Sequence, residues 1–217
     1  MQWRLLAGVP DEEIRRLLTV ARRRQFARDE VVFHRDDPGD SLHLIVKGRF
    51  AIRIMTPLGD TAMIGVRGAG DHFGEMALLA DGHGRAATIA ALEEAETYAV
   101  THSEFEALRR RHPGVNDVLM RLLAGEVRRL DERLLEALYL PAEKRLRRRL
   151  CELAELYGGD NGEAEIPLTQ EKLAELAGTS RATVNRVLRE EEKRGTLELR
   201  RRRTVIRDLE ALARRAR

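Results

Sequence analysis

The stretch LTQEKLAELAGTSRATVNRVLREEEKRG, residues 168–195, constrains the fold more than any other part of the chain. Its apolar residues recur at steps of three and four on both sides of Gly178, which predicts two short helices joined by a tight turn. Thr169 is a candidate cap for the first helix, and Ser180 or Thr179 for the second. The segment therefore predicts a helix-turn-helix.

The second predicted helix carries arginines on its outward face. Arg181 and Arg186 lie where such a helix enters the major groove, and an arginine there can donate to guanine O6 and N7 together. Hydroxyls, amides and helix-start N–H groups can hold phosphates. We expect a DNA-binding set of Thr169, Gln170, Thr179, Ser180, Arg181, Ala182, Asn185, Arg186 and Arg189. The alternative is an ordinary helical hairpin with solvated arginines.

A β-hairpin is predicted directly after this motif, with the run Arg200–Arg203 at its tip. Four crowded guanidinium groups favour a nearby anion, so we expect phosphate contacts from Arg201 and Arg202, although a merely soluble turn is the alternative. Residues 141–217 hold 19 Lys and Arg against 14 Asp and Glu, a net charge of +5, whereas the rest of the chain has −2. The C-terminal part is thus the better partner for a polyanion.

A long helix is predicted from about Val115 to Leu140, where Pro141 ends it. A single helix of roughly 25 residues is about 38 Å long and too exposed to be stable alone. Its apolar residues recur at coiled-coil spacing and predict a homodimer seam: Met120, Leu123, Val127, Leu130, Leu134 and Ala137. The alternative is that this stripe packs on the preceding domain.

The N-terminal part has a different pattern. Asp11 is a candidate cap for a first helix. From about Gln25 to Val100, short runs alternate between apolar and polar residues and are separated by turn clusters, which predicts an antiparallel β-barrel or roll. The clusters are residues 37–40, 47–48, 57–60 and 68–71, and a further loop is predicted at 158–162. We expect an α+β chain with domains at 1–113 and 141–217, joined by the dimerisation helix 114–140.

Composition excludes several classes of protein. The single cysteine, Cys151, cannot form an internal disulfide or an iron–sulfur site, and its spacing among leucines favours core packing. No apolar run approaches the ~18 residues of a membrane span, and the first residues lack a signal-peptide pattern. We expect a cytoplasmic protein with no membrane partner.

Five motifs together resemble the Crp-Fnr family of bacterial transcription regulators over nearly the full length of the chain. They are Asp37–Leu42, Lys47–Arg49, Phe73–Leu79, Arg85–Thr88 and Ser180–Arg186. The resemblance implies a cyclic-nucleotide-binding-type β-roll (a jelly roll), a long dimerisation helix and a C-terminal winged helix-turn-helix. It also implies double-stranded DNA with a palindromic TGTGA-like operator as partner, and RNA polymerase if the protein is an activator.

The resemblance further implies a phosphate-binding cassette for a ligand such as cyclic AMP or another cyclic nucleotide. The expected ligand residues are Gly74, Glu75, Met76, Arg85, Ala86 and Arg133. Glycine lets the backbone approach a ligand, Glu75 can accept from a ribose hydroxyl, and Arg85 can neutralise a cyclic phosphate. In the alternative, Glu75 and Arg85 satisfy each other.

The sequence departs from the family pattern in three places. Ala86 stands where the family's cyclic AMP binders have serine. Residues 116–140 contain no serine or threonine to recognise adenine, so Asp131, Glu132 or Arg133 are the candidates for that role. Ala182 stands where the family places a glutamate that accepts from cytosine, which implies a loosened preference at that base pair.

Two further functions stay open at this point. One is a regulator of the same family that binds DNA without any ligand. The other is a cupin-like metalloenzyme, which would need inward-facing histidines. The six histidines are scattered, although His72 and His83 flank the cassette. We expect no metal and no catalytic residues.

Overall fold

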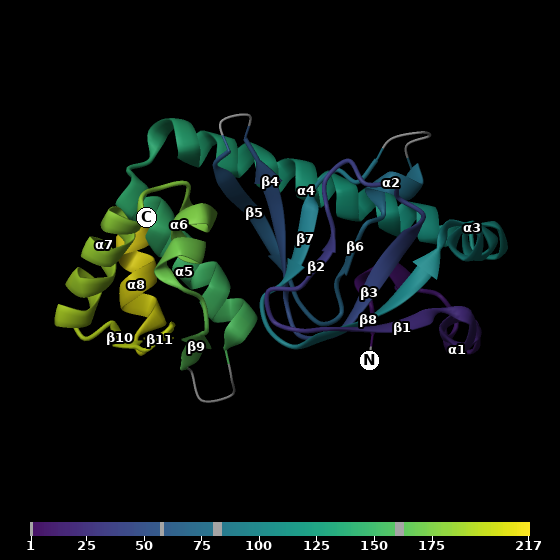
Figure 1. Ribbon diagram of the computed structural model, residues 1–217, viewed down its shortest axis with the longest axis horizontal. Helices are drawn as coiled ribbons and strands as arrows, with labels where there is room; N and C mark the ends of the chain where they lie inside the picture. The colour runs from purple at the N-terminus through teal and green to yellow at the C-terminus, as the bar shows by residue number, and fades with distance from the viewer. Residues whose placement is uncertain (1, 57–58, 80–83, 159–162) are drawn as a thin grey trace. The chain divides into compact units, whose positions relative to one another are not determined.

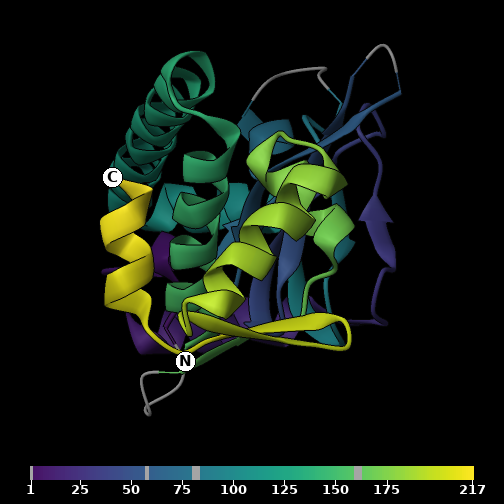
Figure 2. The same cartoon turned by 90° about the vertical axis from the view of Figure 1, so that its left-hand side faces the viewer.

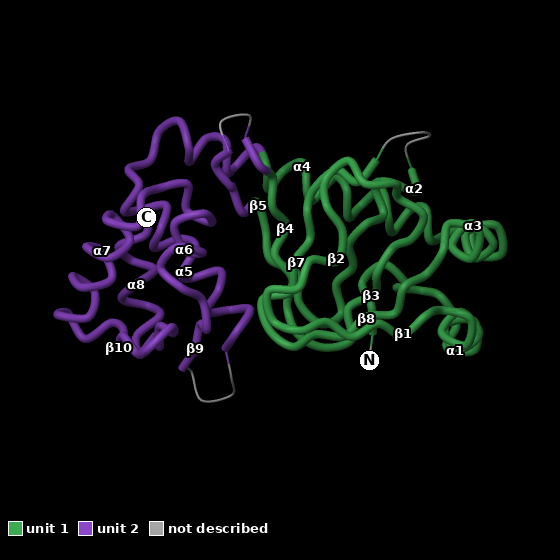
Figure 3. The backbone as a smooth tube through the Cα atoms, in the orientation of Figure 1, with its two compact units in different colours: residues 1–54, 64–130 green, residues 55–63, 131–217 purple. Residues whose placement is uncertain are grey.

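The computed structural model describes residues 2–56, 59–79, 84–158 and 163–217 (Figure 1). It contains two compact units, residues 1–54 with 64–130 and residues 55–63 with 131–217 (Figure 3). The long helix α4 (Gly114–Tyr139) belongs to the first unit up to Leu130 and to the second from Asp131. Three predictions fall partly or wholly outside the described residues. They are the turn at 57–60 (residues 57 and 58), the loop at 158–162 (residues 159–162) and His83 beside the cassette.

The first unit holds most of the predicted antiparallel β-roll, although residues 55–63 of the roll group with the second unit. The strands of the roll are β1 (Arg22–Phe26), β2 (Val31–Phe33), β3 (Ser41–Lys47), β4 (Phe50–Met55), β5 (Thr61–Arg67), β6 (His72–Phe73), β7 (Thr88–Ala91) and β8 (Ala95–Thr101). They form two four-stranded sheets, ordered β1-β8-β3-β6 and β2-β7-β4-β5. The described strand pairs of this roll, such as β3 with β8 (Leu42 opposite Val100), are antiparallel, in agreement with the alternating sequence pattern.

Apolar residues of both sheets fill the interior of this roll. Phe50 meets Phe26 edge to face at 5.7 Å and Phe73 at 4.9 Å between ring centroids. A second cluster lies beneath the helices and includes Phe105 and Val115. The helices of this unit are η1 (Arg4–Leu6), α1 (Asp11–Val20), α2 (Met76–Leu79), α3 (His102–Arg111) and the first part of α4. The N-terminal turns of α4 are therefore packed into the core.

The expected cap at Asp11 is wrong. Pro10 occupies the N-cap position without a side-chain hydrogen bond, and Asp11 is the first helical residue of α1. Asp11 therefore takes the first helical position, one residue earlier than a cap role would place it, and there its negative charge still suits the positive end of the helix dipole. In contrast, α3 begins with a capping box, in which the side chains of Thr101 and Glu104 each accept from the other's backbone N–H.

The second unit is the predicted winged helix-turn-helix. After α4 ends before Pro141, it contains α5 (Ala142–Tyr157), β9 (Ala164–Ile166), α6 (Gln170–Ala177), α7 (Arg181–Lys193), β10 (Leu197–Arg200), β11 (Arg203–Ile206) and α8 (Leu209–Ala216). The strands form one antiparallel sheet in the order β10-β11-β9. Figure 2 shows the β10–β11 hairpin as the yellow-green ribbon below the helices of this unit.

Local signals fix the turn between α6 and α7. Thr169 accepts a hydrogen bond from the backbone N–H of Lys172, and Ser180, rather than Thr179, accepts one from Thr183. Gly178 ends α6 with φ +59°, in the left-handed region where glycine is favoured. The turn predicted from the sequence is therefore confirmed in its detail.

Two further findings bear on function. No helix among the described residues is long and apolar enough to cross a membrane. Cys151 is half-buried, and burial raises the pKa of its thiol to about 11. Because the thiolate is the reactive form, this cysteine is unreactive near neutral pH.

Candidate ligand pocket and nucleic-acid interface

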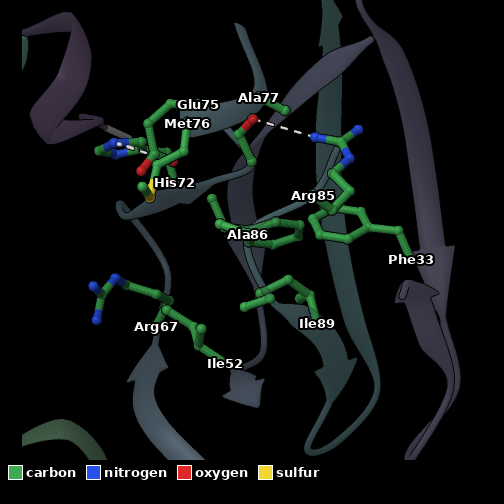
Figure 4. Close-up of a pocket in the computed structure, with 13 residues that line it drawn as sticks. Phe33, Ile52, Arg67, His72, Glu75, Met76, Ala77, Arg85, Ala86 and Ile89 are labelled. Carbon is green, nitrogen blue, oxygen red and sulfur yellow. Dashed lines mark hydrogen bonds and ion pairs between the residues drawn. The ribbon is translucent and has the colours of Figure 1, made fainter. Parts of the chain in front are cut away.

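The β-roll contains a small pocket with a cavity volume of about 80 Å³ (Figure 4). Five of the six predicted ligand residues line it, namely Gly74, Glu75, Met76, Arg85 and Ala86. The other lining residues are Phe33, Ile52, Arg67, His72, Phe73, Ala77, Ala87 and Ile89. The two sequence-distant cassette motifs thus meet at one cavity.

Arg85 is the most tightly held polar group of this pocket. Its side chain is 4% exposed. Nη1 donates to the carbonyl oxygens of Ser41 (2.6 Å) and Gly74 (3.2 Å), and the guanidinium lies 4.1 Å from the ring centroid of Phe33. Nε is buried and has no hydrogen-bond partner among the described residues. Arg85 is therefore an oriented, desolvated cation with one unmet donor.

Gly74 is required by the position of Arg85. Its φ is +90°, and a Cβ atom there would lie 2.8 Å from Nη1 of Arg85 and 3.0 Å from the carbonyl oxygen of Ser41. Any side chain would push the guanidinium away. The glycine thus permits a close approach of the backbone to Arg85.

Glu75 does not pair with Arg85. Its carboxylate lies 3.9 Å from Nε2 of His72, whereas Arg85 donates to Ser41 and Gly74 and lies 3.8 Å from the exposed carboxylate of Asp40. Burial lowers the pKa of His72, so His72 is uncharged near neutral pH and does not neutralise Glu75. The expected alternative, a mutually satisfied carboxylate and guanidinium, is therefore not what the structure contains.

Arg67 is a pocket residue that the sequence analysis missed. Its Nη2 donates to Oε1 of Glu126 on α4, and Glu126 also accepts from Arg129 at 2.6 Å. Within the first unit, this ion pair joins the pocket wall to the long helix. The available signal was an arginine two residues after Gly65, on the inward face of strand β5.

Arg133, the sixth predicted ligand residue, is not among the residues that line the pocket. It belongs to an ionic network between the end of α4 and α5 in the second unit. Its Nη2 donates to Glu152 at 3.1 Å, and Glu136 accepts from Arg148 (2.8 Å) and Arg149 (2.5 Å). This network holds the two helices together across the Leu140–Pro141 turn.

The predicted dimer seam on α4 is largely uncovered. Met120 is 67% exposed and Leu134 59%. Val127, Leu130 and Ala137 are exposed too, whereas Leu123 is half-buried against the core of the first unit. The apolar surface extends beyond the prediction, through Leu135, Leu138 and Tyr139. Such a contiguous apolar surface is typical of a protein–protein interface.

The outward face of α7 carries all the predicted side chains in exposed positions, namely Arg181, Ala182, Asn185, Arg186 and Arg189. Arg181 forms no ion pair within the described part of the chain. Arg186 bonds to Glu143 at 2.5 Å, and Arg189 bonds to Glu192 at 2.8 Å. Asn185 accepts from Gln170 of α6 at 3.4 Å. The predicted base-reading arginines therefore differ in how they are held.

The four arginines of the hairpin also divide into two kinds. Arg200 bonds to Glu198 at 2.7 Å, and Arg203 bonds to Glu165 at 2.5 Å. Arg201 and Arg202 form the turn, are exposed, and have no ion pair with any residue that the structure describes. These two, the pair predicted to contact phosphate, are thus open to an external anion.

No group of three His, Cys, Asp or Glu side chains that could hold a metal ion occurs among the described residues, which do not include His83. The cupin-like alternative therefore has no observation in its favour.

Comparisons with known proteins match both units. A model of the cyclic nucleotide-binding domain matches residues 23–112, and a model of the Crp-like helix-turn-helix domain matches residues 144–215.

A CRP-like cAMP-activated global transcriptional regulator of Mycobacterium tuberculosis is 30% identical over 216 residues, covering 98% of this chain and 96% of the relative. The cyclic AMP receptor protein of Thermus thermophilus is 33% identical over 195 residues, 90% of this chain and 88% of the relative. The solved structure of FixK2 from Bradyrhizobium japonicum has a TM-score of 0.79 at 22% identity, covering 90% and 96% of the two chains, and shares the fold.

Proposed function

The chain belongs to the family of Crp-like transcription regulators, and we propose that it is a homodimer whose affinity for DNA is set by a cyclic nucleotide or a similar phosphorylated ligand. In this proposal residues 1–113 sense the ligand, residues 114–140 form the dimer interface, and residues 141–217 bind DNA.

The observation that carries the ligand proposal is the state of Arg85. A buried guanidinium with an unmet Nε–H is unfavourable by about 1–3 kcal/mol, and a phosphate oxygen in the adjoining pocket is a suitable acceptor. Glu75 would accept from a ribose hydroxyl. Ala86 offers no hydroxyl, so the phosphate would depend on Arg85 and backbone N–H groups. Two relatives are named for cyclic AMP, which makes cyclic AMP the first ligand to test.

The ion pair of Arg67 with Glu126 supplies a route from the pocket to α4. A ligand that moves Arg67 changes the contact of the β-roll with that helix. For this to regulate DNA binding, the ligand must bind more tightly to the DNA-competent arrangement than to the other. The presence of a formed pocket and this link favour ligand control over the ligand-independent alternative.

The dimer proposal rests on the uncovered apolar surface of α4. Pairing two copies along Val127, Leu130 and Leu134 would bury it and relate the two DNA-binding units by a two-fold axis. Two α7 helices could then enter successive major grooves, about 34 Å apart, of a palindromic TGTGA-like operator. RNA polymerase is a partner if the protein is an activator.

Within each half-site, Arg181 and Arg186 would read guanines, with Asn185, Ala182 and Arg189 beside them. The predicted phosphate contacts come from the helix starts and the hairpin tip: Thr169, Gln170, Thr179, Ser180, Arg201 and Arg202. Contacts of this kind fix the register of a protein on DNA but carry no sequence information.

Calorimetric titration tests the ligand. The full-length protein is titrated with cyclic AMP, cyclic GMP and cyclic dinucleotides, and operator binding is measured with and without each. We expect heat from at least one ligand, tighter DNA binding in its presence, and loss of both in Arg85→Ala. The control Arg110→Ala removes an exposed arginine of α3, outside the pocket. Tight operator binding with no heat from any ligand would support ligand-independent binding instead.

A further inference from the structure

Arg186, a proposed base reader, is held by a carboxylate from another helix. Its Nη2 donates to Oε1 of Glu143 on α5 at 2.5 Å, and its Nη1 reaches Oε1 of Glu190 at 3.5 Å, the limit of a hydrogen bond. The first turn of α7 contains no acidic residue. The close anionic partner of Arg186 therefore comes from α5, 43 residues earlier in the chain.

Glu143 is well placed for this contact. It lies in the first turn of α5, two residues after Pro141, where the positive end of the helix dipole favours a negative charge. The Arg186 guanidinium, followed by the backbone N–H of Glu143, lowers the pKa of this carboxyl, and Glu143 in turn raises the pKa of Arg186. Glu143 is thus an anion throughout the pH range in which DNA binds.

The same turn of α5 is anchored to the helix-turn-helix. Arg145 donates from Nε to the carbonyl oxygen of Ala177 (3.2 Å) and from Nη2 to that of Gly178 (2.8 Å). Its Nη1 donates to the carbonyl oxygen of Leu140 at 2.9 Å. One side chain therefore joins the end of α4, the start of α5 and the turn before α7, and so Glu143 is fixed relative to Arg186.

We propose that Glu143 is a positioning residue for base recognition, which holds the Arg186 guanidinium in the orientation that reads one guanine of each half-site. This inference rests on the proposed sequence-specific DNA binding. Arginine has five donors in a rigid plane, and the bond to Glu143 uses one of them, so others remain for guanine O6 and N7. Holding the plane in advance reduces the side-chain entropy that is lost when DNA binds.

The competing explanation is that Glu143 is only an anion that competes with DNA for Arg186. The two explanations predict different effects of removing the negative charge of Glu143. A positioning residue contributes to the discrimination between base pairs, whereas a competing anion weakens binding to all sequences alike. The measurement must therefore report discrimination separately from affinity.

The experiment is selection from a duplex library with two randomised, inverted half-sites, followed by anisotropy titrations on the selected duplex, on its single-base-pair variants and on random DNA. Full-length wild type is compared with Glu143→Gln, Arg186→Ala and the double variant. The control Glu210→Gln removes an exposed carboxylate of α8 that lies 3.9 Å from Arg214. Circular dichroism verifies that each variant is folded, and Glu143→Asp, which keeps the charge, serves as a second variant.

We expect Glu143→Gln to lower discrimination at one guanine about tenfold and to leave the other positions unchanged. In the Arg186→Ala background, the same substitution should have no effect on discrimination, because Glu143 acts through Arg186. Glu143→Asp should retain part of the discrimination. The inference is overturned if Glu143→Gln leaves discrimination unchanged, or if Glu143→Gln still lowers discrimination in the Arg186→Ala background. Either result would leave the proposed DNA binding intact. If the wild-type protein selects no sequence from the library, the proposed sequence-specific DNA binding is itself contradicted.

Discussion

Arg147 on α5 donates a hydrogen bond from Nε to Oε1 of Glu191 on α7 at 2.9 Å, and the Glu191 side chain has no exposed surface. The same carboxylate accepts from Nη2 of Arg215 on α8 at 2.6 Å and from Oγ1 of Thr196 at 2.8 Å. One buried anion therefore joins three helices of the DNA-binding unit and fixes the inner side of α7, opposite its arginines.

Glu191→Gln should destabilise this unit by about 3 kcal/mol, because breaking a buried ion pair leaves uncompensated buried charge. Chemical denaturation of the full chain, followed by helical circular dichroism, measures the change. The control is the neighbouring Glu190→Gln, which removes a partly exposed carboxylate 3.5 Å from Arg147. That variant should lose less than about 1 kcal/mol. Equal effects of the two substitutions would contradict the role assigned to Glu191.

The pH dependence of stability should carry the signature of Glu191. Hydrogen bonds from Arg215, Arg147 and Thr196 outweigh burial and lower the pKa of its carboxyl from 4.5 to about 2. A lowered folded-state pKa stabilises the protein above the unfolded-state value, and this stabilisation is lost as the pH falls from about 4.5 to about 2. Unfolding at pH 7 and at pH 3 should therefore differ more in wild type than in Glu191→Gln. The same difference in both proteins would assign the acid sensitivity to other groups.

Gly74→Ala should remove ligand binding by displacing Arg85. The new Cβ atom would lie 2.8 Å from Nη1 of that guanidinium, and the left-handed backbone adds strain of about 1–3 kcal/mol. Gly8→Ala is the matched control, because Gly8 has φ +85° but nothing within 4 Å of its added Cβ. Both variants should unfold more easily, whereas only Gly74→Ala should lose heat in a cyclic nucleotide titration. Normal binding by Gly74→Ala would show that the position of Arg85 is not important for the ligand.

The regular elements of this fold were predictable because their signals are local. Pro141 predicts the end of the long helix, and the structure ends α4 at Tyr139. Thr169, Gly178 and Ser180 likewise act on backbone groups a few residues away. The cap at Asp11 failed because the helix begins one residue earlier, with Pro10 at the N-cap and Asp11 already helical.

The ionic contacts of the candidate sites were not predictable in the same way. Arg67 with Glu126 and Arg186 with Glu143 join residues 59 and 43 positions apart. The chain has 39 Lys and Arg and 36 Asp and Glu, so each charge has many potential partners, and only the fold selects among them. The pocket residues Gly74 and Arg85 were found through motifs, which report a site without its hydrogen bonds.

The dimer should dissociate when the exposed stripe of α4 is interrupted. Leu134→Asp places a charge within the seam, where it would be buried without a partner. Sedimentation equilibrium should show a monomer, and binding to a palindromic operator should weaken at least ~100-fold, since each monomer holds only one half-site. Arg128→Glu, at an exposed position of α4 outside the seam, should remain dimeric. A dimeric Leu134→Asp protein would place the interface elsewhere.

Substitutions of a base-reading arginine and of a phosphate-contacting arginine should affect DNA binding differently. The first should change sequence preference, and the second should change the salt dependence of binding. Arg181→Ala should relax the preference at one guanine, at a cost of about 1–3 kcal/mol for the specific duplex and little for random DNA. Arg201→Ala should weaken binding to both duplexes alike and reduce the slope of log K against log salt by about one, because one phosphate contact is lost. Arg203→Ala is the matched control for the hairpin, since Glu165 already neutralises that side chain at 2.5 Å. Arg203→Ala should change the slope of log K against log salt by less than Arg201→Ala does. A change of about one would mean that Arg203 breaks its ion pair with Glu165 and contacts a phosphate when DNA binds.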